Sequence, residues 1–415
     1  MKGKTELVRA LSLTDAVGVG LGAIIGAGIF VVTGVAAGVS GPSFLVGLLV
    51  AGLVASFNGL SSAQLAAVYP RSGGTYEYGY QLLNPVFGFS AGWMFLVSKL
   101  SAAGVVAIGF GTYFYQIFPF GSPAVIAAVA VILLTVANMF GIRKAGKLNL
   151  FIVSITLISL SYFIFSGFPE VQAANFTPFA PFGFSGIAES AAILFFAFTG
   201  YARIATLAEE VRNPEKTIPK AIIITIISAI VLYSLVSFVA VGLIGTLEMS
   251  ASKSPLQLAA QSLNSPFVSR IIIIGAAAAM LGVLLSQILG ISRMMFAMGR
   301  RRDLPSFFER IHPKYKVPHV GIGVTGAIVG VLATAGNFEF IVRTASFTIL
   351  VYYGITNIAA LQQPQNQQRY GKMVAVLGLA GCLAMAVSLP FKVIAVGIVI
   401  LLTGFLLRSV IKKIS

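Results

Sequence analysis

Apolar stretches long enough to cross a bilayer follow one another along nearly the whole chain, separated by short polar segments. A membrane helix needs about 20 apolar residues, and the ten-residue alternation of a membrane barrel is not seen. The pattern predicts an all-α polytopic membrane protein of about twelve helices forming a single domain over residues 1–415. The expected spans are residues 13–38, 43–68, 86–116, 122–141, 147–168, 186–208, 219–245, 267–297, 318–336, 338–361, 372–389 and 391–409.

Glycines interrupt two of these stretches, at residues 26–28 in the first span and at Gly200 in the sixth. Glycine weakens a helix, and a bilayer tolerates the freed peptide groups only where protein or a water-filled cavity satisfies them. Interruptions in matching spans predict two inverted five-helix repeats, over about residues 13–168 and 186–361. Two further helices, about residues 372–409, are then appended.

The first interruption predicts a binding site for a zwitterion. If the helix unwinds there, the amides of Ala27 and Gly28 begin a new helical segment, where backbone N–H groups attract a carboxylate. The carbonyl of Ile24 then becomes an acceptor for an ammonium group. The alternative is that Gly18, Gly22 and Gly26, which recur every fourth residue on one helix face, serve close helix packing through small residues, although packing does not explain Gly28.

The interruption in the sixth span also predicts part of a binding site. The carbonyls of Phe196, Ala197 and Thr199 lie beside Gly200, where they can accept hydrogen bonds from an amine. Phe196 is large enough to cover a substrate and is the expected gate. The alternative is that Phe196 is an ordinary core or lipid-facing aromatic residue.

Charged residues are rare within the spans, and Lys99 lies near the middle of the third. Because a charge in hydrocarbon is costly, such a lysine is functional or structurally paired, and both interpretations stay open. Glu189, in the outer part of the sixth span, is the one candidate acid for a cavity that accepts organic cations.

The net charge of +16 follows the predicted topology. Most lysines and arginines fall in segments on one side of the membrane, whereas the other side holds Lys253, Arg270, Arg343 and Lys392. The positive-inside rule then places both termini in the cytoplasm. Basic charge of this kind does not indicate a nucleic-acid partner.

Signals for enzymatic chemistry are thin. The two histidines and the single cysteine form no metal-binding cluster, and no phosphate-binding loop with its lysine is present. We therefore expect no enzyme activity, no metal and no cofactor, so uphill transport would use an ion gradient or exchange.

Four ordered motifs make the chain resemble the amino acid–polyamine–organocation (APC) transporter superfamily. They occupy residues 26–30, residues 70–78, residues 195–200 together with 209–222, and residues 291–305. The resemblance covers most of the chain. It implies the leucine-transporter-type 5+5 inverted-repeat fold and alternating access.

The resemblance also assigns roles to individual residues. It implies that Ala27 and Gly28 hold the carboxylate of an amino acid, and that the third span adds Ser98 and Ala102 to the pocket wall. The α-ammonium would be held by the carbonyls of Ile24, Phe196, Ala197 and Thr199.

The chain departs from the family pattern at a residue that couples transport to an ion gradient. Some members carry a lysine in the fifth span that replaces a sodium ion, whereas this chain has Thr156 at that place. Lys99 can take that role, or a sodium ion can bind near Ser286. The coupling ion is therefore expected to be a proton, with sodium as the alternative.

These observations predict a secondary active amino-acid permease of the cell membrane (plasma or inner), proton-coupled or exchanging, monomeric or homodimeric. Its apolar pocket wall favours a small or neutral amino acid. A polyamine or organocation permease and a non-transporting amino-acid sensor remain the alternatives.

Overall fold

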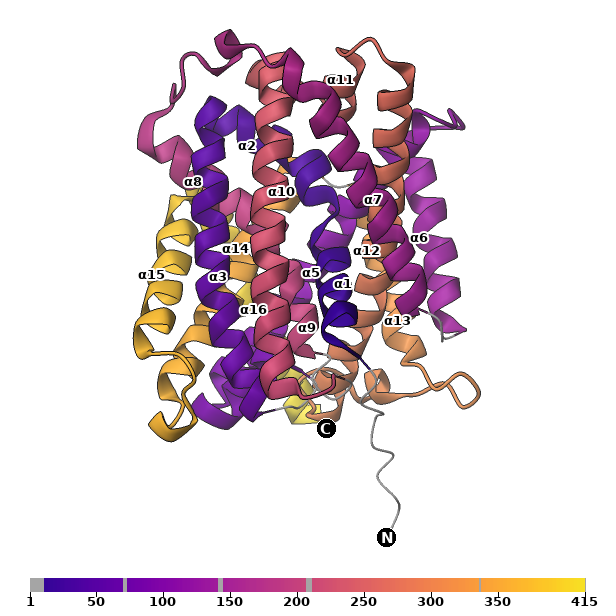
Figure 1. Ribbon diagram of the computed structural model, residues 1–415. Coiled ribbons are helices and arrows are strands. Elements are labelled where there is room, and N and C mark those ends of the chain that lie inside the picture. The colour runs from indigo at the N-terminus through magenta and orange to yellow at the C-terminus, as the bar shows by residue number, and fades with distance from the viewer. Residues whose placement is uncertain (1–10, 70–72, 141–144, 207–210, 336, 415) are drawn as a thin grey trace.

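The computed structural model describes residues 11–69, 73–140, 145–206, 211–335 and 337–414. These residues form a bundle of helices without a β-sheet, and their one strand-like feature is an isolated bridge between Leu11 and Val211 (Figure 1). α1 begins and α16 ends at the same end of the bundle, the lower end in Figure 1.

The principal elements follow the predicted spans in order. They are α1 (Leu13–Ile24), η1 (Gly28–Val32), α2 (Thr33–Ser40), α3 (Phe44–Val68), α4 (Thr75–Tyr78), η3 (Gly79–Leu83), α5 (Pro85–Tyr115), α6 (Pro123–Met139), α7 (Ala145–Gly167), α8 (Gly183–Phe198), η6 (Thr199–Tyr201), α9 (Ala202–Thr206), α10 (Pro214–Ala251), α11 (Pro255–Gln261), α12 (Pro266–Arg300), α13 (His319–Ala335), α14 (Phe338–Gln362), α15 (Lys372–Ser388) and α16 (Phe391–Ile414).

Eight helical segments of the described chain are long and apolar enough to cross a membrane, and three shorter apolar helices accompany them. One of the eight, Leu13–Val68, contains the first two predicted spans. Each predicted span thus corresponds to an apolar helical segment, and the all-α polytopic fold class is confirmed. The seventh span differs at its end, where the helix continues to Ala251 through a kink at Gly245, whose φ is 71°.

The first span is interrupted at the predicted place. α1 ends at Ile24, and Ile25 takes an extended conformation with φ −77° and ψ 104°. The chain resumes as the π-helix η1, where the amides of Ile29 and Phe30 both donate to the carbonyl of Gly26, at 3.2 and 3.4 Å. The helix therefore comes apart over Ile25 and Gly26.

The sixth span changes more gently than expected. α8 ends at Phe198, and the chain tightens into the 3₁₀ turn η6 before α9 begins at Ala202. The amide of Thr199 still bonds to the carbonyl of Phe196, three residues back. A 3₁₀ turn keeps the chain hydrogen-bonded while it redirects the carbonyls, so no fully extended residue is needed here.

Glycines hold the two interrupted spans against each other. A Cβ on Gly28 would lie 2.6 Å from the Cβ of Ala197, and a Cβ on Gly200 would lie 2.3 Å from the backbone carbonyl of Ala23. Both glycines have negative φ, so close approach of the backbones, and not an unusual conformation, requires them.

Replacing Gly200 by alanine tests this contact. The obstacle is backbone and cannot rotate away, so we expect Gly200→Ala to destabilise the protein by about 1–3 kcal/mol through overpacking. The measurement is the thermal unfolding midpoint of purified protein in detergent. Gly330→Ala is the control, because its new Cβ would meet nothing within 4 Å; equal midpoints for the two variants would contradict the proposed contact.

Candidate substrate site at the helix interruptions

Side-chain hydroxyls bind the carbonyls that the two interruptions expose. Tyr233 on α10 donates to the carbonyl of Ile24 at 2.8 Å, and Tyr353 on α14 donates to the carbonyl of Thr199 at 3.3 Å. The Thr199 hydroxyl donates to the carbonyl of Phe196 at 3.0 Å. A carbonyl oxygen has two lone pairs, so the Ile24 and Thr199 carbonyls can each accept one further bond from a ligand, whereas the Phe196 carbonyl already accepts from both the amide and the hydroxyl of Thr199.

Sequence reasoning missed both tyrosines. The available signal was a phenol within an apolar span, because a hydroxyl buried in hydrocarbon needs a partner. Both side chains are fully buried and pack among aromatic rings of the sixth span: Tyr353 lies edge-on to Phe195, and Tyr233 lies against Phe198, with ring centroids 5.6 and 5.5 Å apart.

Lys99 on α5 reaches the sixth-span interruption. Its Nζ donates to the hydroxyl of Thr199 at 3.2 Å and lies 5.8 Å from the centre of the Phe95 ring. The lysine picked out by its sequence position therefore contacts a residue of the expected ammonium site.

A small cavity of about 60 Å³ opens beside Lys99, on the lower side of the interruptions. Ser286, the expected sodium-site residue, also lines it. The full lining is Ala23, Phe95, Lys99, Thr199, Gly200, Ala202, Arg203, Val283, Ser286, Gln287, Gly290 and Ile291. Glu209, a candidate partner of Arg203 by sequence, lies outside the described residues.

Other expected site residues lie away from this cavity. Ser98 is buried and donates to the carbonyl of Ala345 on α14 at 3.0 Å. Ala102 is buried and lines neither this cavity nor the large chamber described below. Thr156 lies between α7 and α12, where its hydroxyl donates to the carbonyls of Ile152 and Gly275 at 2.9 and 3.4 Å.

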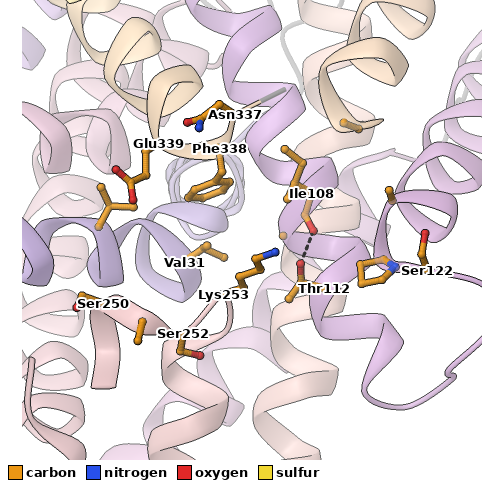
Figure 2. A pocket seen from close by; sticks show the side chains of 16 residues that line it. Val31, Ile108, Thr112, Ser122, Ser250, Ser252, Lys253, Asn337, Phe338 and Glu339 are labelled. Carbon is orange, nitrogen blue, oxygen red and sulfur yellow. Dashed lines mark hydrogen bonds between the residues drawn. The ribbon is translucent and has the colours of Figure 1, made fainter. Parts of the chain in front are cut away.

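A large chamber of about 600 Å³ lies on the other side of the interruptions, toward the upper end of the bundle. Its lining comes from η1, α2, α5, α6, α13, the start of α14 and the α10–α11 junction. Figure 2 shows the side chain of Lys253 lying across it between Val31 and Thr112. The chamber and the small cavity share no lining residue, and along the first span the interruption lies between Ala23, which lines the cavity, and Val31, which lines the chamber.

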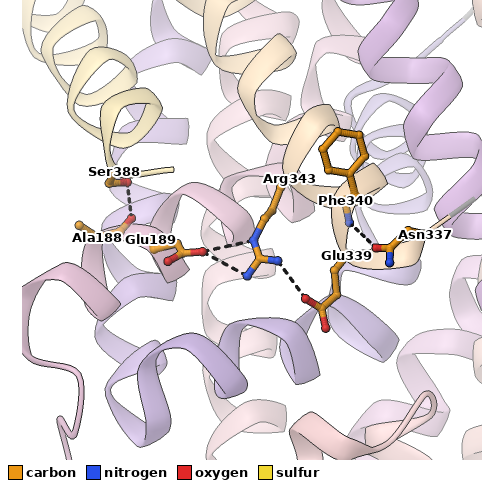
Figure 3. A network of polar contacts seen from close by, with 7 residues as sticks. All are labelled: Ala188, Glu189, Asn337, Glu339, Phe340, Arg343 and Ser388. Atoms are coloured by element: carbon orange, nitrogen blue, oxygen red, sulfur yellow. Dashed lines mark hydrogen bonds and ion pairs between the residues drawn. The ribbon is translucent and has the colours of Figure 1, made fainter. Parts of the chain in front are cut away.

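An ion-pair network ties α8 to α14 near this chamber (Figure 3). Arg343 contacts Glu189 on α8 at 3.2 Å and Glu339 on its own helix at 2.9 Å. Glu189, the candidate acid for an organic cation, is thus engaged by an arginine, and the large chamber's lining does not include it.

A second polar network lies at the lower end of the bundle. The fully buried carboxylate of Asp303, just beyond α12, accepts hydrogen bonds from the hydroxyls of Tyr76 and Tyr80 at 2.7 and 2.6 Å. Arg408 on α16 donates to the same carboxylate at 2.8 Å and to Tyr80 at 2.8 Å. α4, η3, the segment after α12 and the last helix therefore meet at one buried acid.

Burial and neighbouring charge keep the two tyrosine hydroxyls of this network protonated. Burial, reinforced by the charge of Asp303, raises the pKa of the Tyr76 hydroxyl well above its usual value, and burial with the Asp303 hydrogen bond does the same for Tyr80. Both phenols therefore stay donors. Burial alone would lower the pKa of Arg301. The hydrogen bond and the charge of Glu77 outweigh burial and raise it, and the Nη2 of Arg301 lies 2.6 Å from the Oε2 of Glu77.

Comparison with known proteins identifies the family. The model of the amino acid permease family matches residues 11–408. The chain belongs to the amino acid permease family of the APC superfamily. The permease is therefore a multi-pass membrane transporter and not an enzyme.

The relatives carry transporter names. The permease is 39% identical to an uncharacterized transporter of Mycobacterium tuberculosis, over 96% of this chain and 90% of the relative. It is 31% identical to a branched-chain amino acid permease of Bacillus subtilis, over 98% and 93%. It is 32% identical to cationic amino acid transporter 4 of Mus musculus, over 84% and 59%.

Removing the Tyr233 hydroxyl tests its role at the interruption. We expect Tyr233→Phe to lower stability by about 1–3 kcal/mol, because the buried carbonyl of Ile24 loses a donor. Thermal unfolding in detergent measures the effect, with Tyr162→Phe, a half-exposed tyrosine on α7, as the control. A Tyr233→Phe variant as stable as the control would show that the hydrogen bond contributes little.

Neutralising Asp303 tests the lower network. We expect Asp303→Asn to destabilise the permease by about 3 kcal/mol, because the guanidinium of Arg408 is left buried without its counter-ion. Adding Arg408→Met should recover part of the loss in the same unfolding assay. Glu309→Gln, at an exposed position of the same loop, is the control; a double variant less stable than Asp303→Asn would contradict the explanation.

Proposed function

We propose that the permease is a secondary active transporter that carries an amino acid by alternating access, with the substrate bound where the first and sixth spans cross. The observation that carries this proposal is the arrangement of the interruption. The break over Ile25 and Gly26 lies along the first span between Ala23, which lines the small cavity, and Val31, which lines the large chamber. A binding point between two separate spaces is what alternating access requires.

The ligand groups follow from backbone polarity. The amides of Ala27 and Gly28 begin the segment that contains η1, and the first amides of a helix have no partner within it, so they suit a carboxylate. The second lone pairs of the Ile24 and Thr199 carbonyls suit an ammonium group. The Phe196 carbonyl joins them only if the ligand displaces the hydroxyl of Thr199. Ala197 packs on Gly28 and fixes the distance between the two halves.

Gating and coupling are assigned to two side chains. Phe196, buried at the end of α8, is the proposed gate. Lys99 is the proposed proton-coupling group, because it is bonded to Thr199 within the crossing. Sodium binding near Ser286 or Thr156, or obligate exchange of amino acids, is the alternative to proton coupling.

Topology and assembly complete the proposal. The protein lies in the cell membrane with both termini in the cytoplasm, because most lysines and arginines fall in the segments on the same side of the membrane as the termini. The working unit is a monomer or a homodimer.

A polyamine or organocation permease is the second candidate, and one observation disfavours it. Such a permease needs acidic groups facing its cavity, whereas Glu189 is engaged by Arg343. An amino-acid sensor without transport would share the binding site, so transport itself must be measured.

Uptake by purified protein in liposomes tests the function. We expect a panel of labelled amino acids to include at least one that accumulates, with uptake driven by an inward proton gradient or by unlabelled amino acid inside. Lys99→Ala should change the pH dependence of that uptake, whereas Lys392→Ala, at an exposed lysine on α16, should not.

Two results would count against the proposal. Absence of uptake for every amino acid under both driving conditions would contradict transport. An unchanged pH profile in Lys99→Ala, with transport intact, would restrict Lys99 to a structural role.

A further inference from the structure

The small cavity beside the crossing has an unusual charge. Two of its lining residues, Lys99 and Arg203, are basic, and none of its lining residues is acidic. It also adjoins the proposed ammonium site, because Thr199 and Gly200 belong to both. A substrate side chain that extends toward the lower end of the bundle would enter this cavity.

Lys99 has neutral partners only. Its Nζ bonds to the hydroxyl of Thr199 and lies near the Phe95 ring, and the ion pairs of the described residues do not include it. An ammonium group has three N–H donors, so hydrogen-bonding capacity remains toward the cavity.

Arg203 adds a second basic group to the lining. Its guanidinium crosses Gly290 on α12, since a Cβ there would lie 2.7 Å from Nη1. Arginine does not lose its proton in proteins, so this cation is permanent.

Gln287 supplies a polar group of another kind. Its Oε1 is buried and has no hydrogen-bond partner among the described residues, and the residue lines the same cavity. The cavity therefore presents N–H donors from two basic residues and one open acceptor. The open acceptor suits an uncharged polar side chain, and the positive charge of Lys99, with no acidic residue in the lining, disfavours an added cation.

We propose that this cavity receives the substrate's side chain and that Lys99 makes the permease selective for amino acids whose side chains carry no positive charge. The inference rests on the proposed function. Like charges a few ångströms apart repel strongly where water does not screen them. A side-chain ammonium in the cavity would face Lys99 with no carboxylate among the lining residues to offset it. The specificity would thus differ from that named for cationic amino acid transporter 4.

Pairs of amino acids with the same shape and different charge isolate this effect. Norvaline and 2,4-diaminobutyrate form one pair, norleucine and ornithine a second, and citrulline and arginine a third. Each competes with a labelled, transported amino acid for uptake by the full-length permease in liposomes at neutral pH. We expect the neutral member of at least one pair to inhibit at a concentration at least ten-fold lower than its cationic counterpart.

A variant then assigns the selectivity to Lys99. Lys99→Met keeps the length of the side chain and removes the charge, so the ratio between neutral and cationic members should fall several-fold. Lys392→Met, an exposed lysine at the start of α16, is the matched control and should keep the native ratio. The competition between neutral and cationic amino acids is also measured in the unmodified protein. The inference is therefore tested even if Lys99→Met does not fold.

The outcomes separate this inference from the proposed function. If no amino acid is taken up, the proposed function fails. If amino acids are taken up but cationic members compete as well as neutral ones, or if neither member of any pair competes, the charge selectivity is wrong while transport stands. An unchanged ratio in a folded, active Lys99→Met would remove the role of Lys99.

Discussion

A peptide group inside hydrocarbon must find a hydrogen-bond partner, and this requirement shapes the centre of the permease. Breaking the first span at Ile25 exposes backbone that a continuous helix would satisfy, at a cost of several kcal/mol for each orphaned group. Tyr233 supplies the missing donor from α10, and Tyr353 does the same for the turn in the sixth span. The interrupted helices are thus completed by side chains from other spans, which leaves the site ordered before a ligand arrives.

The crossing of the two spans adds a steric condition. Gly28 rests on Ala197 and Gly200 rests on the backbone of Ala23, so each interruption is positioned by the other. The amides of one span and the carbonyls of the next can therefore converge on one small molecule. Along the first span these contacts lie between Val31, which lines the large chamber, and the lower wall of the small cavity formed with α9 and α12.

Much of this could be predicted from the sequence, because membrane spans and glycine interruptions are local patterns. The apolar stretches marked the helices, and residues 26–28 marked the first break. Partners far apart in sequence left no local signal. Ser98 pairs with Ala345 on α14, so its side chain is committed to helix packing. The sixth span was expected to unwind like the first, but 3₁₀ bonding redirects its carbonyls with less disruption.

The fastening of the last helix has a mechanical implication. α16 has the smallest buried share of the eight candidate spans, 22% of its apolar stretch, yet Arg408 inserts its guanidinium beside the acid that joins the loops below α3 and α12. Together with the hydrogen bond from Trp93 on α5 to the Ile400 carbonyl, this contact keeps the peripheral helix from moving independently of the core. If the lower ends of α3 and α12 tilt, α16 must either move with them through the surrounding lipid or lose the ion pair between Arg408 and Asp303. The viscosity and thickness of the bilayer would therefore affect the rate of the transport cycle.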